Sequence, residues 1–150
     1  MKAFKTLLLG LGACLAVGSA WADDPDVEYF GIEDAPNLPF SEAVRVDDTL
    51  YVSGSIGAVP GSSTLVEGGI GPETRQTMDN IKAVLEKHGS SMSQVVKCTV
   101  FLADIAEWGA MNTVYVTYFP DHKPARSALG ASGLALNARV EIECIATVDD

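Results

Sequence analysis

Two charged side chains in the last third of the 150-residue chain have the types needed for chemistry on a small acid. Arg126 follows the rigid Pro124, and Glu141 lies in the alternating run Val140-Glu141-Ile142-Glu143. Arginine and glutamate are rare in strand interiors unless they are paired or functional. An arginine can hold a carboxylate through two parallel hydrogen bonds, and a nearby glutamate can accept a proton from water. We therefore predict that Arg126 and Glu141 are catalytic; an ion pair between them across the sheet is the alternative.

The first 22 residues have the pattern of a secretory signal peptide. Two lysines precede an apolar run over residues 6–19, and Ala20-Trp21-Ala22 matches a cleavage site. The apolar run is shorter than a membrane-spanning helix requires. We expect cleavage after Ala22, a periplasmic or secreted location, and no membrane association of the processed chain. Lipidation at Cys14 is the less favoured alternative, because it would leave the later cleavage site without a purpose.

The composition narrows the class of partner. The formal net charge is −10, with 20 acidic and 10 basic residues. Binding of nucleic acid depends on neutralising phosphates with lysine and arginine, so this charge argues against a nucleic-acid partner. The length that remains after residue 22 is enough for one domain with its own hydrophobic core.

Two cysteines lie beyond the signal peptide, Cys98 and Cys144, each in an apolar run. Each is in phase with apolar neighbours two residues away, so we expect both to face the core. In an oxidising compartment they could form a disulfide. We favour the alternative, two separate buried thiols that pack as small hydrophobic residues.

Hydrophobic periodicity gives the order of elements after an N-terminal arm. Residues 23–39 are polar and rich in proline, which indicates a loosely held arm before a domain over 40–150. Pro72 and Gly89 mark the start and end of one helix. Asp104 and Glu107 form the capping box of another, which ends at Pro120. The predicted strands are 43–46, 50–56, 95–103, 126–131 and 139–148.

This order predicts an α+β fold with one sheet and both helices on one face. The apolar stripes of the helices would cover that face; they are Thr74, Met78, Ile81, Leu85 and His88 in the first helix, and Trp108, Met111, Tyr115 and Tyr118 in the second. The other face would carry Glu141, Glu143 and Thr147 with Ile145 between them. Such a mixed face predicts association between copies of the chain.

Seven short segments in this order make the chain resemble the RidA/YjgF family of small imine deaminases, from about Glu33 to Val148. They are LPFSEA (38–43), LYVSG (50–54), TMDNI (77–81), VKCTVFL (96–102), MN (111–112), PARS (124–127) and VEIE (140–143). The resemblance implies a chorismate-mutase-like fold and a homotrimer with a cleft between each pair of subunits. It also implies hydrolysis of 2-imino or 2-enamino acids to 2-keto acids and ammonia, without a metal or an organic cofactor.

The resemblance also implies roles for single residues. The arginine that holds the substrate carboxylate falls on Arg126, and the carboxylate that positions the hydrolytic water falls on Glu141. Ser53 and Gly54 match a strand end that lines the cleft, and Asn112 matches a polar residue of the second helix. We expect these three residues to bind substrate.

Three positions depart from the usual pattern of the family. Ala128 replaces a cysteine but keeps the backbone N–H that contacts the carboxylate, Phe40 replaces a tyrosine of the cleft, and Ser55 replaces a glutamine. We include Phe40 and Ala128 among the substrate-binding residues and expect the departures to alter the range of substrates. Together with export, they leave open an alternative function, a non-catalytic periplasmic trimer that binds small carboxylates.

Overall fold

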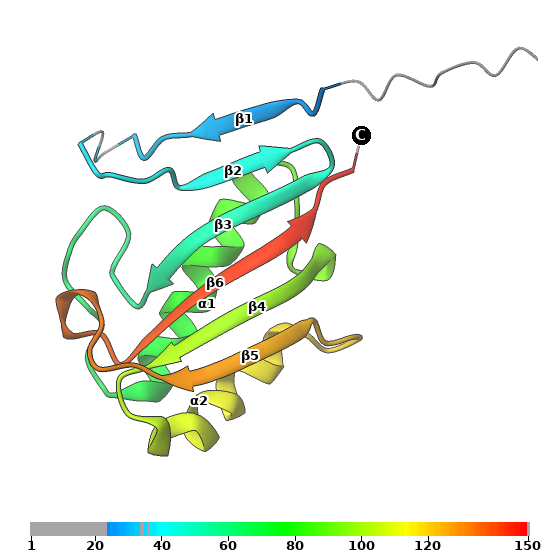
Figure 1. Ribbon diagram of the computed structural model, residues 1–150. Coiled ribbons are helices and arrows are strands. Elements are labelled where there is room, and N and C mark those ends of the chain that lie inside the picture. The colour runs from blue at the N-terminus through cyan, green and yellow to red at the C-terminus, as the bar shows by residue number, and fades with distance from the viewer. Residues whose placement is uncertain (1–23, 34, 36, 150) are drawn as a thin grey trace, which may run out of the picture.

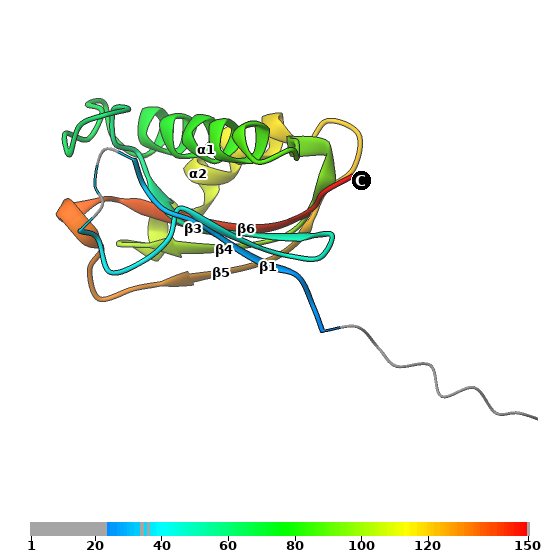
Figure 2. The same ribbon diagram turned by 90° about the horizontal axis from the view of Figure 1, so that it is seen from above.

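The computed structural model describes residues 24–33, 35 and 37–149. The predicted signal peptide and Cys14 therefore lie outside the described residues. Helices α1 (Ile70–Lys87) and α2 (Trp108–Tyr115) pack on one face of a single six-stranded sheet, as Figures 1 and 2 show. This architecture confirms the predicted α+β fold.

The sheet has the strand order β1-β2-β3-β6-β4-β5. The strands are β1 (Val27–Phe30), β2 (Ala43–Val46), β3 (Thr49–Ile56), β4 (Val95–Leu102), β5 (Ala125–Gly130) and β6 (Val140–Thr147). Strands β4 and β5 are parallel, and the other neighbouring pairs are antiparallel. Four short 3-10 helices lie between these elements: Met92–Gln94, Ile105–Glu107, Val116–Tyr118 and Ala135–Asn137. The last strand of the chain thus lies at the centre of the sheet.

The core lies between the helices and the sheet face that they cover. Alternate residues of β6 point into it, namely Val140, Ile142, Cys144 and Ala146. From α1 it receives Thr74, Met78, Ile81 and Leu85, all fully buried, as the helical spacing predicts. The residues between the buried positions of β6 point to the opposite face, which is how the fold displays Glu141.

Helix α1 begins and ends close to the predicted positions. It starts at Ile70, so Pro72 lies in the first turn, where the N–H that proline lacks has no helical partner. At the other end Gly89 has a φ of 78°, and the N–H of Ser90 donates to the carbonyl of Leu85 at 2.8 Å. This pairing ends the helix in the way that the glycine predicts.

The N-terminal arm is more ordered than the sequence predicts, because residues 27–30 form strand β1. It pairs antiparallel with β2, with Val27 opposite Val46 and Phe30 opposite Ala43. The ring of Phe30 stacks on that of His88, with 4.0 Å between the ring centroids. A four-residue edge strand with mostly exposed side chains has no alternating pattern, so the sequence contains no signal for it.

Cys98 and Cys144 both face the core, as predicted, but they are joined in a disulfide. The prediction of two separate thiols was wrong. The two residues are directly opposite each other on the antiparallel strands β4 and β6, and their Cα atoms are 4.1 Å apart. The apolar pattern of each strand predicts which way a side chain points, but not the register that places the two cysteines together.

The predicted capping box before α2 is half correct. The carboxylate of Asp104 accepts a hydrogen bond from the N–H of Ala106 at 2.9 Å, but it caps a 3-10 turn. The carboxylate of Glu107 does not fold back toward this cap, because it pairs with the guanidinium of Arg139. In the stripe of α2, Met111 and Tyr115 are buried, whereas Trp108 is 46% exposed.

Candidate functional site

Arg126 lies on the edge strand β5 and points to the helix-covered side of the sheet. Its Nη1 donates a hydrogen bond to Oδ1 of Asn112 at 2.6 Å. Its guanidinium carbon lies 4.7 Å from the ring centroid of Tyr115 and 5.7 Å from that of Trp108. One hydrogen bond and two aromatic rings from α2 therefore hold the cation in place.

Arg126 lines an open cleft of about 600 Å³ between α2 and the start of β5, and within the described residues its guanidinium makes no hydrogen bond besides the one to Asn112. No carboxylate of the described residues lies within 4.0 Å of the guanidinium. Burial raises the pKa of Tyr115 to about 12, although the charge of Arg126 opposes this, so the phenol beside the arginine is neutral. The guanidinium of Arg126 is thus held in one position, and the cleft beside it has room for a carboxylate.

Ala128 lies two residues along β5, on the same side as Arg126. The N–H of Ala131 donates to the carbonyl of Leu102 on β4. Successive N–H groups of a strand alternate in direction, and the register of β5 on β4 has no irregularity. The N–H of Ala128, three residues earlier, therefore points away from β4 toward the free edge of the sheet. This placement suits the predicted role as a donor to a carboxylate.

Glu141 lies on the other side of the sheet, in contact with Gly54 of β3. A Cβ atom added to Gly54 would lie 2.2 Å from Oε1 of Glu141, so only glycine leaves room for this carboxylate. The strands come together here after a bulge between Val52 and Ser55. The two predicted site residues are therefore adjacent in space, although 87 positions separate them in the sequence.

Ser53, the neighbour of Gly54 in β3, is hydrogen-bonded to the segment that carries Phe40. Its hydroxyl donates to the carbonyl of Ser41 at 2.7 Å, and its N–H donates to the carbonyl of Glu42 at 3.1 Å. The side chain of Phe40, just before Ser41, is 51% exposed. We call Arg126, Asn112 and Ala128 the arginine half-site, and Glu141, Gly54 and the neighbouring Ser53 the glutamate half-site. Phe40 is linked to the glutamate half-site through the carbonyl of Ser41.

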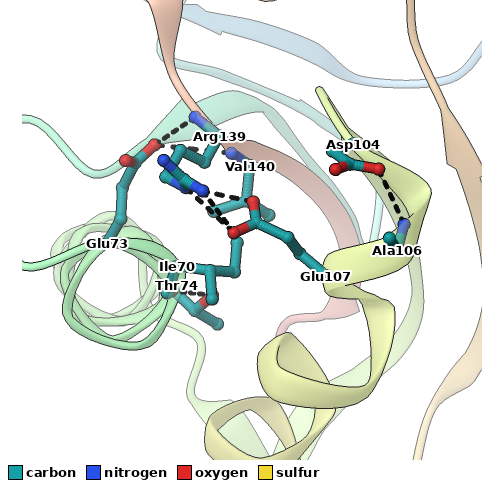
Figure 3. A network of polar contacts seen from close by, with 8 residues as sticks. All are labelled: Ile70, Glu73, Thr74, Asp104, Ala106, Glu107, Arg139 and Val140. Atoms are coloured by element: carbon teal, nitrogen blue, oxygen red, sulfur yellow. Dashed lines mark hydrogen bonds and ion pairs between the residues drawn. The ribbon is translucent and has the colours of Figure 1, made fainter.

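Glu73, which the sequence did not indicate as a site residue, fixes the start of the strand that carries Glu141. Its side chain is 3% exposed, and its Oε1 accepts hydrogen bonds from the N–H groups of Arg139 at 2.6 Å and Val140 at 3.4 Å. Figure 3 shows this carboxylate reaching from α1 to the backbone just before Glu141, beside the Arg139–Glu107 pair. The only sign of this role in the sequence is the position of Glu73, an acidic residue directly before the first residue of the buried stripe of α1.

The two half-sites do not face each other in one chain. On β4, Cys98 is opposite Arg126 and Phe101 is opposite Glu141. Residues 98 and 101 point to opposite faces because the side-chain period of a strand is two. The ion pair considered as an alternative is therefore absent between Arg126 and Glu141.

The described residues contain neither a group of candidate metal ligands nor a membrane-spanning helix. Within these residues, no three histidine, cysteine, aspartate or glutamate side chains are grouped so that they could hold a metal ion. No helix in the part of the chain described by the structure has the length and apolar character needed to span a membrane.

Comparison with known proteins shows the family of this chain. A family model described as endoribonuclease L-PSP matches residues 32–148. The mouse protein named 2-iminobutanoate/2-iminopropanoate deaminase is 44% identical over 108 residues, which are 72% of this chain and 80% of the mouse protein. The chain belongs to the RidA/YjgF family.

Solved structures of RidA/YjgF proteins have the same fold. The crystal structure of yeast Mmf1 has a TM-score of 0.76 and 35% sequence identity, over 83% of this chain and all of the yeast chain. Escherichia coli TdcF, crystallised with bound serine, has a TM-score of 0.70 and 27% identity, over 75% of this chain and 90% of its own. As a RidA/YjgF protein, this chain has relatives that are named imine deaminases, among them the mouse and human proteins.

Proposed function

We propose that the protein hydrolyses 2-imino and 2-enamino acids to 2-keto acids and ammonia. The observation that carries this proposal is the geometry of Arg126, which Asn112 holds through one nitrogen and which lines an open cleft. An imino acid offers a carboxylate that fits such a fork. The relatives that are named imine deaminases, among them the mouse and human proteins, support the same reaction.

In the proposed reaction, Arg126 and the N–H of Ala128 hold the substrate carboxylate. Glu141 accepts a proton from a water molecule as the water oxygen bonds to the carbon of the C=N group. Glu141 then passes this proton to the nitrogen, which gives a tetrahedral carbinolamine and returns Glu141 to its ionised form. As this intermediate collapses, the hydroxyl proton moves to the nitrogen, the C=O group forms and ammonia leaves. The overall reaction consumes one water for each imine.

We propose that the complete site forms between two copies of the chain in a homotrimer. One copy would supply the arginine half-site and its neighbour the glutamate half-site, because in one chain the two face opposite sides of the sheet. The sheet face without helices is suited to association. In the described residues it carries the exposed apolar side chains of Tyr51 and Leu129 beside the acids of β6.

We further propose that the protein works in the periplasm or outside the cell after removal of residues 1–22. The disulfide between Cys98 and Cys144 supports an oxidising compartment, since such bonds are rare in the cytosol. Fractionation of cells that express the full chain, with mass determination of the product, tests this. Product in the periplasmic fraction with its N-terminus at Asp23 is expected, whereas a cytosolic full-length protein would contradict the proposal.

The deamination proposal is tested with imines made in the assay by an amino-acid oxidase. The purified protein is expected to accelerate the disappearance of the imine, and Arg126→Ala is expected to reduce this rate by about 100-fold or more, because the variant loses a bidentate charged contact. Arg75→Ala, which removes a surface arginine of α1 outside both half-sites, is the control. A wild-type protein without effect on any of several imines would end this proposal.

A second function, binding of small carboxylates without turnover, is favoured by one observation. TdcF, a relative at 27% identity, was crystallised with serine, an amino acid with a free carboxylate. Calorimetry with 2-keto acids distinguishes the two functions: binding by a protein that is silent in the deaminase assay would indicate a binding module. Nuclease activity, which the family model's description names, is disfavoured by the formal net charge of −10.

A further inference from the structure

The cleft beside Arg126 has an unusual charge for this protein. The chain has twice as many acidic as basic residues, yet the two charged residues that line the cleft, Lys123 and Arg126, are both basic. Two cations that line one cleft attract anions more strongly than either one alone. The cleft is therefore a local exception to an acidic surface.

Lys123 is available for a ligand. Its side chain is exposed, and among the described residues no carboxylate lies within ion-pair distance of it. Pro124 follows it directly and also lines the cleft, so the backbone between the two cations has little freedom. A lysine is a compact point charge on a flexible stem, which suits contact with an anion whose distance from Arg126 varies.

The two cations differ in what they can do. Arg126 is held by Asn112, Tyr115 and Trp108, so its position is fixed, and its fork suits the carboxylate common to all 2-imino acids. No hydrogen bond or ion pair with a described residue holds the ammonium of Lys123, so it is available to a second anionic group on a substrate bound in the same cleft. An alkyl side chain would instead lie beside an unpaired charge.

We propose that the preferred substrates are 2-imino acids with a second acidic group, such as those formed by oxidation of aspartate and glutamate. This inference rests on the proposed deaminase function and makes it more specific. Lys123 is then a specificity residue: it binds the second carboxylate and takes no part in bond making or breaking at the C=N carbon. Its loss affects dicarboxylic substrates and spares monocarboxylic ones.

The experiment compares wild type with Lys123→Met on four imines, made from aspartate, glutamate, alanine and 2-aminobutanoate. Lys123→Met keeps the length and apolar stem of the side chain but removes its charge. We expect kcat/KM to fall about tenfold for the two dicarboxylic imines and to change less than about twofold for the others. Lys82→Met, on the exposed face of α1, is the matched control and should change neither.

A fall of equal size for both substrate classes would overturn the inference, as would no change for either. Calorimetry with 2-oxoglutarate and 2-oxobutanoate gives a readout that does not depend on turnover. Tighter binding of 2-oxoglutarate that is lost in Lys123→Met supports the inference even if no imine is hydrolysed, so failure of the deaminase proposal remains distinguishable. Equal affinity of wild type for the two keto acids would contradict it.

Discussion

Arg126 and Glu141 point to opposite faces of one sheet, with β4 lying between their strands. Each has its own partners: Asn112 holds the arginine, and Gly54 leaves space for the glutamate. A small imino acid cannot touch both side chains of the same chain. A catalytic role for both residues therefore requires the arginine of one copy and the glutamate of another.

This relationship predicts complementation between two inactive variants. Arg126→Ala and Glu141→Gln should each be nearly inactive as pure proteins. When equal amounts are unfolded and refolded together, about a quarter of all sites in the randomly assembled trimers should combine an intact arginine with an intact glutamate, because each mixed trimer contains one such site. Recovered activity near this fraction is the expected result in the imine assay. If mixing restores nothing although mixed trimers are present, the site is not shared between copies.

Gly54→Ala should lower the rate of catalysis in a protein that still folds. The new methyl group would lie 2.2 Å from Oε1 of Glu141, so this carboxylate must move. We expect kcat to fall by about tenfold or more. Gly31→Ala is the matched control, because a Cβ at Gly31 meets nothing within 4 Å. Unchanged kcat in Gly54→Ala would show that the position of Glu141 does not matter.

Glu73→Ala should destabilise the protein and displace the start of β6. It removes the acceptor of two backbone N–H groups, of Arg139 and Val140, and leaves them unpaired. We expect the free energy of unfolding in urea to fall by about 1–3 kcal/mol. Glu73→Gln keeps a carbonyl oxygen in place and should recover most of the stability. Equal losses in both variants would mean that the negative charge, and not the acceptor, matters.

The stability contributed by Glu42 should depend on pH. Burial alone would raise the pKa of this carboxyl. The hydrogen bonds from His88 and Lys87 together lower the pKa by more than burial raises it, so it lies below its ordinary value of 4.5. A carboxyl with a lowered pKa stabilises the fold above its ordinary value, and this contribution is lost as the pH falls through the folded pKa. Urea unfolding should show Glu42→Gln less stable than wild type at about pH 7, with the difference shrinking below pH 4.5. A difference that stays constant across this range would contradict the prediction.

Local patterns in the sequence predicted the helices and most of the strands. The stripe of α1, its glycine end and the alternation of β6 each depend on neighbours within a few residues, which the sequence shows directly. Strand β1 has no such pattern, and its place depends on pairing with β2 and on the stack of Phe30 with His88. Patterns within a short segment therefore do not predict a strand whose position depends on pairing with residues far away in the sequence.

The same division applies to the candidate site. The residue types of Arg126 and Glu141 indicated chemistry, and the family resemblance supplied Asn112 and Gly54. The hydrogen bond from Arg126 to Asn112, the space at Gly54 and the disulfide all depend on sheet register, which single segments do not reveal. The role of Glu73 was not predicted because its partners are backbone N–H groups, which do not depend on residue type and so give no sequence pattern.

The disulfide closes a loop of chain from Cys98 to Cys144, and this loop contains α2, β5, Arg126 and Glu141. A single cut by an endoprotease in the largely exposed stretch 131–137 would therefore leave two pieces that are still one covalent molecule. The strands on either side of the cut would keep their partners in the sheet. Cleavage there would be visible as two bands only after reduction, and the nicked protein could keep both half-sites in place.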